Sequence, residues 1–232
     1  MRINQRLLKP RPLALIGELM LAVALVLAAG LLAAVVGQQL AGENVMALHI
    51  IVVQGLVILA GLQAILRWRG IRWPDLGLVR PVAQDVPRAL IILLAVFAGN
   101  GLFAGLVMLA SPGTLEQHHA RLGEVAGFLV GGLPFLAIAA AMLFVAVYEE
   151  LLARGFLLQR SRLLIAGIWG PVLLSSLLFG LGHGYQGWIG IAQTALVGII
   201  LARATLYWGT LWPAIIAHAV LNTVALSILQ TL

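Results

Sequence analysis

The sequence contains no cysteine and few charged residues. Without cysteine there is no disulfide, no thiolate metal ligand and no cysteine nucleophile. Charged residues are 9% of the 232 residues and hydrophobic residues are 62%, whereas a soluble domain is about 25% charged. So few charges cannot cover a surface that faces water, so lipid must be the solvent for much of it. This composition excludes a soluble protein and predicts an all-α, polytopic membrane helix bundle.

Two other absences narrow the function. The sequence has neither the HExxH signature of many zinc peptidases nor a P-loop for nucleotide phosphates. Basic residues outnumber acidic ones, 14 Lys and Arg against 8 Asp and Glu. They stand between the apolar runs, where they set membrane topology rather than bind nucleic acid. No nucleic-acid partner is therefore expected.

Long apolar runs predict about seven transmembrane helices, within a range of six to eight. A bilayer core takes about 20 helical residues. The first run is too long for the ~7–15-residue apolar region of a signal peptide, so we expect it to be retained. One membrane-embedded domain is expected over residues 1–232, with its motif-bearing core at about 125–230. The expected spans are 13–40, 45–66, 87–110, 125–158, 167–185, 188–206 and 211–230.

The distribution of basic residues predicts the orientation. With the N-terminus inside, the inner segments hold Arg2, Arg6, Lys9, Arg11, Arg67, Arg69, Arg72, Arg80, Arg88, Arg160, Arg162 and Arg203. The outer segments hold only Arg121, together with Glu43, Glu116 and Glu124. Because positive charge stays on the cytoplasmic side, we predict a multi-pass protein of the cell (cytoplasmic) membrane with its N-terminus in the cytoplasm.

Ionisable residues at membrane depth are costly and often functional. The run Glu149-Glu150-Leu-Leu-Ala-Arg154 places two carboxylates in an apolar helix. Glu150 and Arg154 are four residues apart, so they share a helix face and can pair. Glu149 lies about 100° around the helix from Glu150 and needs another partner. The alternative is that the whole group is a structural ion cluster.

Two later spans supply further polar residues. Phe179-Gly-Leu-Gly-His183 ends one span, and His218-Ala-Val-Leu-Asn222 stands on one face of the last. Each alone could be a hydrogen bond between helices. The expected depths of Glu149, His183 and His218 are compatible within the uncertainty of the span boundaries. We therefore expect the three helices to bring these side chains toward one intramembrane pocket.

Such a pocket has a definite chemistry. A carboxylate beside an imidazole can position and deprotonate a water. With a second imidazole the same groups match the ligands of catalytic zinc, and the Asn222 amide can donate to an oxyanion. This predicts amide hydrolysis by activated water. Serine chemistry fits less well, because Ser175 and Ser176 have no evident acid–base relay.

At these residues the sequence resembles the CPBP family of CAAX proteases and bacteriocin-processing enzymes, which includes the type II CAAX prenyl endopeptidases. The family pattern is EExxxR, FxxxH and HxxxN on successive membrane helices. It is matched without departure by EELLAR at 149–154, FGLGH at 179–183 and HAVLN at 218–222. The resemblance implies an intramembrane endopeptidase whose pocket opens toward the cytosol and the bilayer.

The resemblance also implies roles for single residues. Glu149 and His183 would activate water, and His218 and Asn222 would stabilise the oxyanion. In a metal-dependent enzyme these four would instead surround Zn²⁺. Glu150 and Arg154 would support the pocket, together with Phe179 of the second motif. A glutamate-type mechanism and a metal-dependent one both remain open.

The expected partner is a membrane-associated peptide or protein, prenylated or not, reached within the lipid bilayer. A non-catalytic membrane scaffold or a bacteriocin self-immunity factor on the same fold is the alternative. A proton-coupled transporter ranks last, because no inverted repeat is visible.

Polar residues outside this group are expected to be structural. We expect Glu18 and His49 to make isolated hydrogen bonds between helices, and His118 and His119 to lie solvated in an outer loop. Small residues four apart allow helices to approach closely. Such pairs are Gly101/Gly105, Gly127/Gly131 and Gly180/Gly184.

Overall fold

The fold is helical throughout the part of the chain that the structure describes. A computed structural model describes residues 12–40 and 43–230, and in these two ranges it contains helices and no strand. The predicted fold class, an all-α polytopic bundle, is confirmed. The predicted basic stub Arg2–Arg11 lies outside the described residues.

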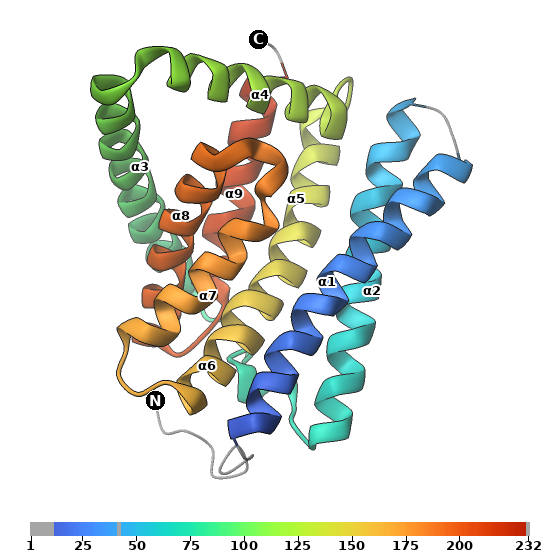
Figure 1. Cartoon of the computed structure of the whole chain (residues 1–232), viewed down its shortest axis with the longest axis vertical. Helices are drawn as coiled ribbons and strands as arrows, with labels where there is room; N and C mark the ends of the chain where they lie inside the picture. The colour runs from blue at the N-terminus through green and yellow to red at the C-terminus, as the bar shows by residue number, and fades with distance from the viewer. Residues whose placement is uncertain (1–11, 41–42, 231–232) are drawn as a thin grey trace.

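The long helices stand side by side, and one helix crosses them at an end (Figure 1). α1 (Pro12–Leu40) and α2 (Glu43–Arg69) form an antiparallel hairpin. A short turn, η2 (Trp73–Leu76), precedes α3 (Asp85–Ala110), and α4 (Pro112–Val130) then lies across the top of the view. The remaining helices are α5 (Phe135–Glu150), α6 (Leu158–Leu164), α7 (Trp169–Gly182), α8 (Gly187–Trp208) and α9 (Trp212–Leu229).

Six helical segments of the described residues are long and apolar enough to cross a membrane, which lies within the predicted range of six to eight. Lipid forces each to be helical, because a backbone there must satisfy its own hydrogen bonds. The predicted span 167–185 is represented by α7, which has only 14 residues. A helix of that length rises about 21 Å, less than the ~30 Å hydrocarbon core. The six segments are Pro12–Gln38, His49–Arg69, Asp85–Ala110, Phe135–Leu164, Gly184–Trp208 and Trp212–Leu229.

α4 corrects two predictions. The expected span 125–158 is broken at residues 131–134, where Gly132 has a φ of 75° and Pro134 precedes α5. The expected outer loop is instead an amphipathic helix. His118 on this helix is buried, and its Nε2 lies 2.9 Å from Gln193 Oε1 of α8. A helix that lies across the ends of several apolar helices is stabilised when its own apolar face packs against them.

One end of the bundle carries nearly all the described basic residues, and we call it the basic end. Two cation–π contacts tie its helices together, Arg88 over Trp208 and Arg203 over Trp169. The opposite end, across which α4 lies, is called the α4 end, and Arg121 is there. The residues of the basic end are Arg67, Arg69, Arg72, Arg80, Arg88, Arg160, Arg162 and Arg203.

Glu18 joins three helices at the basic end. Its side chain is 2% exposed, and its two oxygens lie 2.8 Å from Arg69 Nε of α2 and 2.8 Å from Arg160 Nε of α6. The predicted isolated hydrogen bond of Glu18 is therefore wrong. A carboxylate buried among apolar helices is tolerated when charges of opposite sign face it.

The segment after η2 closes the basic end. The Leu211 amide donates to Gly77 O at 3.0 Å, and the Trp212 indole donates to Val79 O at 2.7 Å. Gly77 has a φ of 95°, which favours glycine. These bonds fix where α9 begins and hence the height of His218 and Asn222 in the bundle.

α7 and α8 approach closely through glycine. A Cβ at Gly180 would lie 2.6 Å from Ile191 O, and one at Gly198 would lie 3.0 Å from Ser176 Cβ. Of the predicted glycine pairs, Gly180/Gly184 thus has one member, Gly180, where two helices approach closely. Gly101, Gly105 and Gly127 face open space instead.

Candidate active site

The first motif lies where the helical geometry changes. Glu149 and Glu150 end α5, and the next residues form a π-helical stretch, η3 (Leu151–Leu157), which contains Arg154. A π-helical turn is rare and occurs frequently at functional sites. The predicted pair is present, with Arg154 Nη1 donating to Glu150 Oε1 at 2.7 Å. Both side chains are almost fully buried.

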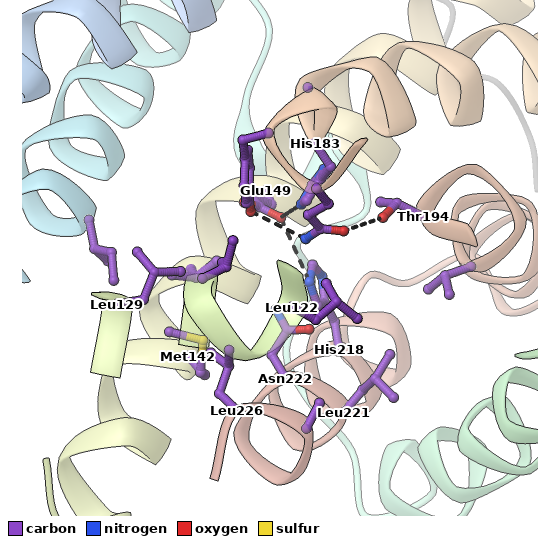
Figure 2. A pocket seen from close by; sticks show the side chains of 18 of the residues that line it. Leu122, Leu129, Met142, Glu149, His183, Thr194, His218, Leu221, Asn222 and Leu226 are labelled. Carbon is purple, nitrogen blue, oxygen red and sulfur yellow. Dashed lines mark hydrogen bonds and ion pairs between the residues drawn. The ribbon is translucent and has the colours of Figure 1, made fainter. Parts of the chain in front are cut away.

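Three helices bring the predicted residues to one place. Glu149 comes from α5, His183 follows the last residue of α7, and His218 and Asn222 lie one turn apart on α9. Figure 2 shows the carboxylate of Glu149 pointing toward both imidazoles, with Asn222 beside His218. All four line one cavity. Glu149 therefore faces both histidines directly.

His218 is held by the second carboxylate of the motif. Its Nδ1 lies 2.8 Å from Glu150 Oε1, the same oxygen that accepts from Arg154. Because an ionised carboxylate can only accept, Nδ1 carries the proton and donates it. Nε2 of the neutral ring is then left with a lone pair, and it faces Glu149. Glu150 thereby fixes both the orientation and the tautomer of His218.

His183 is held by the backbone. Its Nδ1 lies 2.9 Å from Phe179 O, one turn earlier in α7. A carbonyl oxygen only accepts, so Nδ1 again donates and Nε2 carries the lone pair. The spacing of four in FxxxH therefore has a structural reason: it places the imidazole over the carbonyl that ends the helix.

Glu149 lies between these two lone pairs. Its Oε2 is 3.9 Å from His183 Nε2 and 3.7 Å from His218 Nε2. The same oxygen is buried and makes no hydrogen bond. Three acceptor atoms facing one another need a proton, a water or a cation between them. The distances are too long for direct hydrogen bonds and short enough for a bridging group.

Phe179 connects the parts of the site. Its ring packs against His183 with centroids 4.8 Å apart and against His218 at 5.9 Å. The guanidinium of Arg154 lies 4.1 Å from the centre of the same ring. The first residue of the second motif therefore packs against a residue of each of the other motifs.

The cavity has a volume of about 680 Å³. Its wall is mainly apolar, but several polar side chains on it were not proposed as site residues from the sequence. They could have been found by searching the apolar spans for every uncharged polar residue as well as for ionisable ones. One of them is Asn100, whose Oδ1 is buried without a hydrogen bond. The group is Gln54, Asn100, Tyr148, Tyr185, Gln186, Gln193 and Thr194.

The atoms that could hold zinc are Glu149 Oε2 and the Nε2 atoms of His183 and His218. The ligand atoms of tetrahedral zinc are about 3.3 Å apart for bonds of ~2.0 Å, somewhat closer than the 3.7 and 3.9 Å seen here. Within residues 12–40 and 43–230, no three His, Asp or Glu side chains form a ready-made metal site. The types of atom suit zinc, and the Glu150–His218 bond is the usual outer support of a histidine ligand. The distances from the Glu149 oxygen to the two imidazole nitrogens are longer than those between the ligand atoms of bound zinc.

The fold and this site define a multi-pass membrane protein with a buried glutamate–histidine cluster at the base of a cavity. Residues 131–224 match the family model described as type II CAAX prenyl endopeptidase Rce1-like. The match confirms, over that stretch, the resemblance indicated by the three motifs. The match supports an intramembrane protease at the level of the family. No curated protein and no solved structure matched the chain.

Proposed function

We propose that this protein is an intramembrane endopeptidase in which Glu149 is the general base that activates water. The observation that carries the proposal is the unpartnered Glu149 oxygen facing two imidazole lone pairs inside a cavity. A structural ion cluster would pair this oxygen with a cation, as Glu150 is paired with Arg154. Among the described residues no lysine or arginine pairs with Glu149, whose oxygen faces only the two imidazoles.

The reaction follows from the positions of the donors and acceptors. A water between Glu149 and His183 donates one hydrogen bond to the carboxylate and the other to the imidazole Nε2. Its oxygen attacks the peptide carbonyl carbon, and Glu149 takes the proton. Glu149 then delivers that proton to the departing amine nitrogen, so the carbon–nitrogen bond breaks with balanced charge.

The oxyanion formed at the carbonyl needs donors on the other side. Asn222 lines the cavity one turn after His218, and its amide can donate. A proton on Nε2 of His218 would make that ring the second donor, with Nδ1 held by Glu150 Oε1 at 2.8 Å.

A glutamate-type enzyme is our first choice, and a zinc enzyme is the second. Zinc is favoured by the two histidine tautomers, which leave Nε2 free to ligate. The ligands would be Glu149, His183 and His218, with Asn222 as a further candidate. Such an ion would polarise the attacking water. Metal content of the purified protein decides between them: about one zinc per chain, lost in Glu149→Gln, identifies the zinc enzyme.

The decisive experiment compares wild type, Glu149→Gln and Glu116→Gln in detergent or proteoliposomes, using mass spectrometry of a pool of apolar peptides. Glu116 is exposed on α4 and is the matched control. We expect loss of cleavage by about 10²–10⁴-fold in Glu149→Gln alone, with unchanged membrane insertion and thermal unfolding. Full activity in Glu149→Gln would refute the assignment and favour a scaffold or self-immunity factor.

The substrate is proposed as a membrane-associated peptide or protein. Among the described residues, an apolar cavity between membrane-spanning helices suits such a chain better than a soluble one. The proposed location is the cell membrane with the N-terminus in the cytoplasm, since the basic end carries all but two of the described arginines, Arg121 and Arg154.

A further inference from the structure

The cavity occupies one half of the bundle. On each spanning helix that lines it and carries arginines, the lining residues lie in the half remote from those arginines. Ile50, Ile51 and Gln54 are near the start of α2, whose last turn holds Arg67 and Arg69. The same holds for Asn100 on α3, Met142 and Val145 on α5, and Gln193 and Thr194 on α8. α9 has no arginine, and its lining residues Leu226 and Leu229 lie near its end remote from Trp212.

The base of the cavity is closed toward the basic end. Glu150, Arg154 and Phe156 are each at most 1% exposed, and they lie between the glutamate–histidine cluster and the basic end. Leu76 and Leu211 pack beneath them around Gly155. The chain between η2 and α3 is hydrogen-bonded across this end.

The rim of the cavity is exposed toward the α4 end. Phe128 of α4 is 48% exposed and Tyr185, next to the start of α8, is 55% exposed. Both line the cavity, as do Leu122 and Val125 of α4. Side-chain exposure thus falls from the rim to Glu149, at 19%, and His218, at 5%. This gradient indicates entry from the α4 end.

The charge on the cavity wall also restricts the substrate. Its lining includes Glu124 and Glu149 but no lysine or arginine within the described ranges. A chain ending in a free carboxylate would bring a negative charge into a low-dielectric site whose described lining has two carboxylates and no lysine or arginine, Arg121 lying outside it against Gly187. An internal peptide bond needs only hydrogen bonds, which the amides of Asn100, Gln193 and Asn222 can provide.

From this geometry we propose that the site takes an internal, apolar segment of a translocated or membrane-anchored peptide, and that the segment enters from the outer side of the membrane. The proposal rests on the endopeptidase function above and on the cytoplasmic location of the basic end. It differs from the cytosolic opening implied by the family resemblance. If positive charge marks the inside, a cavity in the half of the bundle remote from the arginines cannot open to the cytosol.

Cysteine labelling tests the side of entry, because the natural chain has no cysteine. Single variants Ala120→Cys on α4, Ala225→Cys in the cavity and Ala83→Cys at the basic end are expressed in bacteria. Ala120 and Ala83 are exposed, and Ala225 lines the cavity. With a membrane-impermeant maleimide on intact cells, we expect labelling of Ala120→Cys and Ala225→Cys, and labelling of Ala83→Cys only after permeabilisation. The reverse pattern, or an Ala225→Cys variant that is not labelled from outside, overturns the proposal.

Cleavage tests the kind of substrate. The purified full chain receives a pool of apolar peptides, each present with a free C-terminal carboxylate and as the C-terminal amide. We expect internal cleavage of amidated peptides at least as fast as of the acids. Cleavage confined to the free acids, near their C-termini, overturns the proposal of an internal segment. Failure of the endopeptidase function would look different: Glu149→Gln would cleave as fast as wild type, whatever the labelling pattern.

Discussion

Glu150 Oε1 lies 2.8 Å from His218 Nδ1, although the two residues are 68 positions apart in the chain. The same oxygen is 2.7 Å from Arg154 Nη1. A single carboxylate atom therefore neutralises a buried guanidinium and orients an imidazole that faces Glu149. The two adjacent glutamates are not equivalent: Glu150 positions the machinery, and Glu149 faces the cavity.

The first prediction separates these two effects of Glu150. Glu150→Gln leaves Arg154 buried without a carboxylate, and breaking a buried pair costs about 3–5 kcal/mol. The double variant Glu150→Gln/Arg154→Met removes that uncompensated charge, so we expect most of the stability to return, measured by thermal unfolding in detergent. Cleavage should stay low, because His218 still lacks its ionised partner.

Full activity in that double variant would contradict a positioning role for Glu150. Arg154→Met alone is the control for the guanidinium, since it keeps the Glu150–His218 bond. We expect it to lose stability and to retain more activity than Glu150→Gln.

The second prediction concerns the oxyanion. Asn222→Asp keeps the shape of the side chain but replaces its NH₂ donor with an acceptor. We expect kcat to fall about 10²–10³-fold with little change in KM, and Asn222→Ala to behave similarly. Steady-state kinetics on a cleaved peptide make the comparison, and a large rise in KM with unchanged kcat would indicate substrate binding instead.

The third prediction concerns Phe179. Phe179→Leu removes the ring that lies 4.1 Å from Arg154 but keeps the carbonyl that accepts from His183. We expect a loss of about 1–3 kcal/mol in stability from the cation–π contact and the lost packing. Activity should fall less than tenfold, as measured beside Glu149→Gln. Complete inactivation of a folded Phe179→Leu protein would show that the ring itself takes part in the reaction.

The fourth prediction concerns the α7–α8 contact that places His183. A Cβ at Gly180 meets the backbone oxygen of Ile191 at 2.6 Å and Ala195 Cβ at 3.0 Å. We expect Gly180→Ala to destabilise the protein by about 1–3 kcal/mol through overpacking. Gly101→Ala, which meets nothing within 4 Å, is the control and should be neutral. Equal unfolding temperatures for the two variants would show that α7 and α8 move apart freely.

Much of the fold follows from the apolar runs. Wherever about 20 apolar residues follow one another, lipid permits little besides a helix, so six of the expected spans appear as long helices. α4 was misjudged because its charged residues, such as Glu116 and Arg121, look like a loop in a hydropathy profile. The contact of His118 with Gln193 and the burial of Ala126 and Val130 show that this helix is packed on the bundle.

The sequence by itself determined the class of protein, the helical spans and the four polar residues that now line one cavity, because burying charge in lipid is costly enough to make each such residue conspicuous. It also determined the pairing of Glu150 with Arg154, which is local to one helix. The tertiary structure decided which carboxylate supports His218, which faces the cavity, and at which end of the bundle that cavity lies. Those properties depend on the rotation and height of α5, α7 and α9 relative to one another, which are set by contacts such as Gly77 with Leu211 and Gly180 with Ile191 that connect distant parts of the chain.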